Sequence, residues 1–182
     1  MPVGANQPLG MATYASADGS GAPLSVANII VTVAAGAANP VTVTLNGVVA
    51  SLGIALLPAT VQSGTASSPS VVVNALDAAG ATIVGPGTYV DASGTTIVIS
   101  LTNSDATAST TLSTTNIGQP GTNVTLAYNG SASFTGATIT AQAPGIPSAA
   151  ATLGVANAAT LAVYTSEGKD CRANIATGPL PQ

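Results

Sequence analysis

The chain has 182 residues, of which only two are basic and six acidic; it has no His and no Trp, and its formal net charge is −4. Two basic residues cannot neutralise a series of phosphates or attract anionic lipid, which argues against nucleic-acid binding and against an electrostatic membrane surface. The lack of His excludes a Ser-His-Asp triad, a Cys–His pair and any His-ligated metal.

The residue types that dominate the chain favour β-structure over helix. Val, Thr, Ala, Gly and Ser are abundant, with 20 Gly and 12 Pro. β-branched residues fit a pleated sheet, Gly and Pro supply turns, and the helix formers Glu, Lys and Arg are nearly missing. High hydrophobicity with a small net charge also argues against disorder. We therefore predict an all-β protein with a core of Val, Ile, Leu and Ala.

Residues 1–50 contain two segments with alternating apolar residues. We predict strands at 25–33 and 41–45, joined by 34–40, with a turn or domain junction at Asn46-Gly47. This stretch is too short for a complete sandwich. We predict that residues 1–50 are a partial β segment, formed by the last strands of a preceding β domain or by strands exchanged with another molecule.

Residues 51–155 carry a series of short alternating segments bounded by turn residues. About 100 residues with this spacing of strands is typical of a seven-strand sandwich. We predict an antiparallel, Ig-like β-sandwich over 51–155, in which Ile99 and Leu126 are core residues on facing sheets. The strands are expected at 51–56, 70–76, 81–84, 95–102, 123–128, 136–143 and 149–155.

Three of these segments place apolar residues on a single face. The faces consist of Ile97, Ile99 and Leu101, of Val124, Leu126 and Tyr128, and of Ala137, Ile139 and Ala141. Because a shift of one residue turns every side chain to the other face, these residues fix the register that we expect.

One strand with its turn, and the last two strands, carry a resemblance to a known family. Residues 71–80 alternate apolar residues and then run Asp, two small residues and Gly, and 137–143 is followed by 149–155. Together these segments resemble bacterial Ig-like domains of the invasin/intimin type over a little more than half of the chain. The resemblance implies an extracellular or periplasmic spacer or adhesive stalk.

Our main functional hypothesis is a non-enzymatic structural or adhesive module of a bacterial cell-surface or secreted protein. It would need no cofactor, no catalytic residue and no metal, and its partners would be neighbouring domains or copies of itself. The first alternative is a self-assembling, pilus-like extracellular fibre subunit that uses strand exchange. A weaker alternative is a carbohydrate-binding accessory module of a secreted enzyme, for which four Tyr and no Trp offer few rings to stack on sugars.

Three carboxylates in the predicted sandwich are isolated in sequence. We expect Asp77, Asp91 and Asp105 to be turn or connection residues, because Asp side chains accept hydrogen bonds from the backbone two residues further on. A Ca²⁺ site would require two or three of them to converge at the same end of the sandwich.

Residues 156–182 are predicted to hold a final strand and a flexible tail, loose from about Thr165. Cys171 lies beside Lys169 and Arg172, so it is either a thiol with a lowered pKa or an incidental tail residue. Residues 1–5 have neither a basic nor an apolar signal region, and the longest apolar runs, such as 48–57, are too short to span a bilayer. The short apolar runs predict no membrane insertion. The resemblance to bacterial Ig-like domains implies an extracellular or cell-surface location, with a signal peptide that is not present in this chain.

Overall fold

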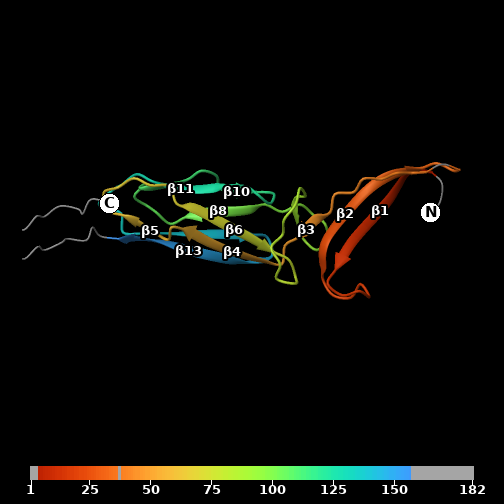
Figure 1. The fold of residues 1–182 in the computed structure, drawn as a ribbon, viewed down its shortest axis with the longest axis horizontal. Helices are drawn as coiled ribbons and strands as arrows, with labels where there is room; N and C mark the ends of the chain where they lie inside the picture. Colours follow the sequence, from red (N-terminus) through yellow and green to blue (C-terminus); the bar gives the residue numbers. More distant parts are fainter. Residues whose placement is uncertain (1–3, 37, 157–182) are drawn as a thin grey trace, which may run out of the picture.

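The computed structural model describes residues 4–36 and 38–156, and Figure 1 shows their arrangement. Over these residues the chain forms strands and turns but no helix, so no helix there is long and apolar enough to cross a membrane. The prediction of an all-β protein is confirmed.

Two sheets form the sandwich. The first is ordered β4-β6-β11-β9, with the strands Ser51–Leu57, Ser70–Leu76, Val124–Tyr128 and Thr110–Leu112. The second is ordered β10-β8-β12-β13-β5, with the strands Asn116–Ile117, Ile99–Asn103, Ala137–Ala143, Ile146–Ala156 and Thr60–Gln62.

A third sheet lies at one end of the sandwich (Figure 1) and is ordered β1-β2-β3-β7. Its strands are Gly4–Tyr14, Pro23–Val33, Asn46–Val48 and Tyr89–Val90. Strands β1 and β2 form a long antiparallel hairpin, which projects from the sandwich.

The strand order is that of an immunoglobulin sandwich. If β4, β6, β8, β9, β11, β12 and β13 are taken as strands A to G, the first sheet is A-B-E-D and the second contains C-F-G. After β4 the chain changes sheets at the cis Leu57–Pro58 bond, and β5 then pairs in parallel with β13. The prediction of an Ig-like antiparallel sandwich is therefore confirmed, with this one parallel edge pair.

The core lies between the two sheets. Ile99 and Leu126 are both fully buried, on β8 of the second sheet and β11 of the first, as predicted. Every residue of the three predicted apolar faces is at least 95% buried, so the register is confirmed for β8, β11 and β12. Aromatic residues contribute at only a few points of this aliphatic core.

One of those points is a tyrosine that closes the connection between β11 and β12. The Tyr128 hydroxyl donates a hydrogen bond of 2.6 Å to the Ser131 carbonyl, and its ring lies 5.1 Å from that of Phe134. In antibody-like domains a tyrosine early in strand F bonds back to the same corner. Here the tyrosine is the last residue of strand E, and its hydroxyl bonds to Ser131, three residues further along the chain. The connection between strands E and F is therefore held by a tyrosine of strand E.

The N-terminal region differs from the sequence-based expectation. Residues 41–45 form no strand, because β2 pairs on that side with Asn46 and Gly47 instead, and Val41 stays 44% exposed. Asn46-Gly47, expected to be a turn or junction, therefore begins a strand. Strand β1 was not predicted, because Gly and Pro interrupt it and lower its β propensity.

Two sandwich segments are also shorter than expected. Within 81–84 only Thr82 forms a β-bridge, to Leu76, and the predicted strand 95–102 begins only at Ile99 after a bridge at Thr96. Each segment follows a tight turn at an Asp residue. The chain reverses direction in that turn and pairs with the preceding strand only through a single β-bridge, Leu76↔Thr82 or Val90↔Thr96. Strand β13 is longer than expected and begins at Ile146.

The core assignment predicts the effect of two truncations. Ile99→Ala and Leu126→Ala should each lower the free energy of unfolding by about 2–5 kcal/mol, because each leaves a cavity between the sheets. Chemical denaturation followed by circular dichroism measures the change. Val98→Ala is the matched control, since Val98 is 45% exposed. An effect at Val98 as large as that at Ile99 would contradict the register.

Candidate functional site

The hairpin is attached to the sandwich through a short seam of strands. Strand β2 pairs with β3 at Ser25↔Gly47 and Val26↔Asn46, and β3 pairs in parallel with β7 at Gly47↔Tyr89 and Val48↔Val90. Val26, Val48 and Val90 form a small buried cluster of their own. The hairpin is therefore joined to the sandwich by backbone pairing and three valines.

Close packing at this seam depends on Gly47 of β3 and on Gly87, where a Cβ atom would meet the Leu45 carbonyl oxygen. A Cβ atom at Gly47 would overlap the side chain of Ile83, on the segment that follows β6. Because Gly47 has no side chain, β3 can pass directly beside Ile83 while it pairs with β2 and β7. This contact brings the seam against the end of the first sandwich sheet.

Strand β1 forms an open edge of the third sheet. It has eleven residues, contains no charged side chain and pairs only with β2. Pro8 has no N–H and is tolerated on an edge strand where that position faces solvent. We infer that Gly10 and Ala12, which alternate with Pro8, also direct their backbone groups outward, while Leu9 and Met11 pair with β2.

Both faces of the hairpin carry exposed apolar side chains. Met11 is 45% exposed on one face, and Ile30 is 72% exposed on the other, opposite Pro8. Tyr14 is 39% exposed at the end of β1. An apolar, uncharged strand with an unpaired edge is a template for pairing with another chain.

Two Asp turns of the same construction lie at the base of the hairpin. The Asp77 Oδ1 accepts hydrogen bonds of 2.9 Å from the N–H groups of Ala79 and Ala81. The Asp91 Oδ1 accepts bonds of 2.9 Å from the N–H groups of Ser93 and Thr95. The prediction that these two carboxylates are turn residues is confirmed.

In each turn a glycine three residues after the Asp adopts the left-handed conformation. Gly80 has φ 78° and Gly94 has φ 85°, and each N–H donates to the carbonyl of the preceding Asp at 3.0 Å. A Cβ at Gly94 would lie 3.0 Å from the Asn28 side-chain nitrogen on β2, so this turn contacts the hairpin. The hydroxyl of Ser93 is the main cause of a lowered pKa of Asp91.

Asp105 lies at the other end of the sandwich. One of its oxygens accepts bonds from the backbone and hydroxyl of Thr107, and the other accepts the same pair from Thr110 at 2.6 and 2.8 Å. Thr110 pairs with Tyr128, beyond the end of β6 that is farthest from Asp77. Burial raises the pKa of Asp105, but the bonds from Thr107 and Thr110 outweigh it and lower the pKa to about 2.

The three carboxylates are therefore not brought together. Across residues 4–36 and 38–156, no three His, Cys, Asp or Glu side chains lie close enough to hold a metal ion. The convergence that a Ca²⁺ site would require is not found for Asp77, Asp91 and Asp105.

Two clefts flank the segment that contains Ile83 and Val84. The first, about 290 Å³, lies between β6, this segment and the turn at Pro120-Gly121. The second, about 300 Å³, lies on the hairpin side and is bordered by Thr13, Leu24 and Asp77. Val84 is 81% exposed between them.

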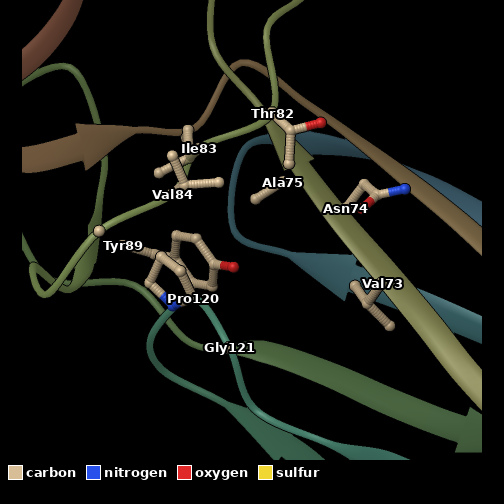
Figure 2. A pocket seen from close by; sticks show the side chains of 10 residues that line it. Val73, Asn74, Ala75, Thr82, Ile83, Val84, Tyr89, Pro120 and Gly121 are labelled. Carbon is tan, nitrogen blue, oxygen red and sulfur yellow. The ribbon is translucent and has the colours of Figure 1, made fainter.

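Figure 2 shows the first cleft, with the Tyr89 ring beside Pro120 and below Ile83 and Val84. Burial of the ring raises the pKa of Tyr89, so its hydroxyl is a neutral hydrogen-bond donor. Aliphatic side chains form most of the remaining wall. A single phenol among aliphatic groups provides neither a nucleophile–base pair nor a set of metal ligands.

The sequence did not lead us to predict strand β1, or the clefts beside Ile83 and Val84. A signal for β1 was present in the alternation of Leu9, Met11 and Thr13, which share one face of the strand. Cys171, Lys169 and the predicted loose tail from Thr165 lie outside the described residues.

The chain matches no family of known proteins, and no curated protein is similar to it at a significant level.

The bonds to the carboxylate predict an acid-sensitive contribution from Asp105. Its pKa is lowered from 3.8 to about 2, so it stabilises the fold above pH 3.8, and this contribution is lost as pH falls towards 2. Asp105→Asn should therefore lower the melting temperature at neutral pH, and the difference from wild type should shrink towards pH 2. Ser113→Ala, which removes a neutral hydroxyl acceptor from the Thr125 N–H, is the control, because its effect should not change with pH. An effect of Asp105→Asn that does not change with pH would contradict this role.

The Asp turns also predict independence from metal ions. Adding a chelator should leave the melting temperature unchanged, because each of these carboxylates already accepts bonds from its own turn. Differential scanning calorimetry with and without chelator measures this. A fall of several degrees would show that a bound ion stabilises the fold.

Proposed function

We propose that this chain is a non-enzymatic structural module of a bacterial cell-surface or secreted protein. In this proposal the Ig-like sandwich is the rigid body, and the hairpin β1–β2 is the part that contacts a neighbouring molecule or domain. The observation that carries the proposal is the uncharged eleven-residue edge strand β1, which projects from the sandwich with its outer edge open.

The placement of the polar groups supports a structural role. The carboxylates of Asp77, Asp91 and Asp105 are used by their own turns, and the clefts beside Ile83 are lined mainly by aliphatic and small residues. General acid–base chemistry needs a titratable group held within reach of a substrate. In the clefts of the described residues, the phenol is that of Tyr89, which is buried and neutral.

A self-assembling fibre subunit is the second candidate, and one observation favours it. The hairpin lies at one end of the elongated molecule and β13 ends at the other (Figure 1). Contacts between unlike ends repeat in one direction, as a fibre requires.

The carbohydrate-binding alternative receives less support. Tyr89 and Tyr128 are 97% and 98% buried, which leaves Tyr14 as the exposed ring among the described residues. Sugars stack on exposed aromatic rings, and a single partly exposed ring provides little surface for such stacking.

The surface location is tested on intact cells that produce the protein. An antibody raised against the folded chain should label unlysed cells or the culture medium. A cytoplasmic protein serves as the control for lysis. Labelling that appears only after lysis would contradict the proposed location and function.

A further inference from the structure

We propose that residues 159–165 of one molecule add as a strand to the open edge of β1 in a second copy, joining molecules head to tail. This inference rests on the proposed structural function and names the partner as another copy of this chain. Three observations carry it: the open edge, the sequence of the segment after β13, and the end of β13 at the opposite end of the molecule from the hairpin.

The accepting edge is the longest unprotected one in the described structure. The edge strands β5, β9 and β10 have three, three and two residues, which is short enough to discourage pairing. Strand β4 has seven residues and lies against β13 of the facing sheet. Strand β1 has eleven residues and no charge to repel an added strand.

The donated segment has the composition of a strand. Residues 159–165 read Ala-Thr-Leu-Ala-Val-Tyr-Thr, with Leu161 and Val163 alternating with Ala162 and Tyr164. β-branched and aromatic residues at alternating positions are typical of strands. The segment is uncharged, and charged residues begin at Glu167. Pairing of this uncharged strand with the uncharged edge of β1 would bury no charged side chain, so it would carry no cost of charge desolvation.

Geometry makes this contact intermolecular. Strand β13 ends at Ala156, at the end of the sandwich opposite the hairpin (Figure 1). Its eleven residues cover about 36 Å. Residue 159 can lie at most about 11 Å from Ala156, so a strand that begins at residue 159 cannot pair with the hairpin of its own molecule.

Because the two contacting segments differ, and β13 ends opposite the accepting edge, the contact does not close on itself. A heterologous contact of this kind produces an open chain of molecules. The backbone of β1 would supply affinity, and the side chains of the alternating residues would supply the register.

The test blocks each surface separately in the full chain. Leu161→Pro removes one N–H from the donated strand, and Ala176→Pro is its matched control further along the chain. Ala12→Lys places a charge on the outer edge of β1, and Val84→Lys places the same charge on an exposed residue away from that edge. Circular dichroism and the thermal midpoint verify that each variant is folded.

Sedimentation velocity and electron microscopy then report the state of assembly. Wild type and both controls should form species whose mass grows with concentration, while Leu161→Pro and Ala12→Lys should remain monomeric. A mixture of the two blocked variants should form dimers that grow no further, because only one productive contact remains. This complementation is specific to a head-to-tail contact between two different surfaces.

Two results would overturn the inference. A wild-type chain that stays monomeric at millimolar concentration excludes it but leaves the structural function, which the labelling of intact cells tests independently. Assembly that survives Leu161→Pro but is lost in Ala12→Lys would show that β1 pairs with another strand, such as β1 of a second copy. That second outcome would leave the hairpin as an interaction surface with a different partner strand.

Discussion

The pairing of β3 with both β2 and β7 is the interaction on which the rest of the surface depends. It comprises two residue pairs on each side, and it is supported by the buried cluster of Val26, Val48 and Val90. A two-stranded hairpin alone is marginally stable in water, so β1 and β2 need this continuation into a larger sheet. The packing of Gly47 against Ile83 then fixes the hairpin against the end of the sandwich.

The charged side chains within residues 4–36 and 38–156, all of them Asp, shape the backbone. Asp77, Asp91 and Asp105 each satisfy N–H groups of a tight turn, and Asp18 does the same in the hairpin. The pKa of Asp18 is lowered to about 2, first by the hydroxyl of Ser16 and then by the backbone of Ser20. Charges used in this way lie close to the backbone and leave the strands uncharged. The lack of charge on β1 is therefore part of a pattern that extends through the described part of the chain.

The sequence predicted the sandwich well, because its strands alternate over a buried face. The faces of Ile99, Leu126 and Ile139 are fully buried, as the period of two residues required. The turn roles of Asp77 and Asp91 were also predictable, since the hydrogen bonds involved are local. The topology identifies the strands as those of an Ig-like sandwich more directly than composition could.

The N-terminal region was harder to predict because its pairing is decided by tertiary contacts. Residues 41–45 alternate as clearly as a real strand, yet β2 pairs with Asn46 and Gly47 beside them. Strand β1 contains Gly10 and Pro8, which weaken the local signal, and it forms because β2 lies opposite. The Tyr89 cleft likewise joins β6, the segment at Ile83 and the turn at Pro120, which are distant in sequence.

The parallel pairing of β5 with β13 has a mechanical consequence. The chain enters the sandwich at Ser51, near the hairpin, and β13 leaves it at Ala156, at the opposite end. Tension applied along the long axis therefore loads the hydrogen bonds between β5 and β13 in shear, so that several must break at once. The pairing of β2 with β3 comprises two residue pairs, against three between β5 and β13, and β3 is covalently continuous with β4 through two residues. A molecule pulled in this direction would yield first at the hairpin while the sandwich remained folded.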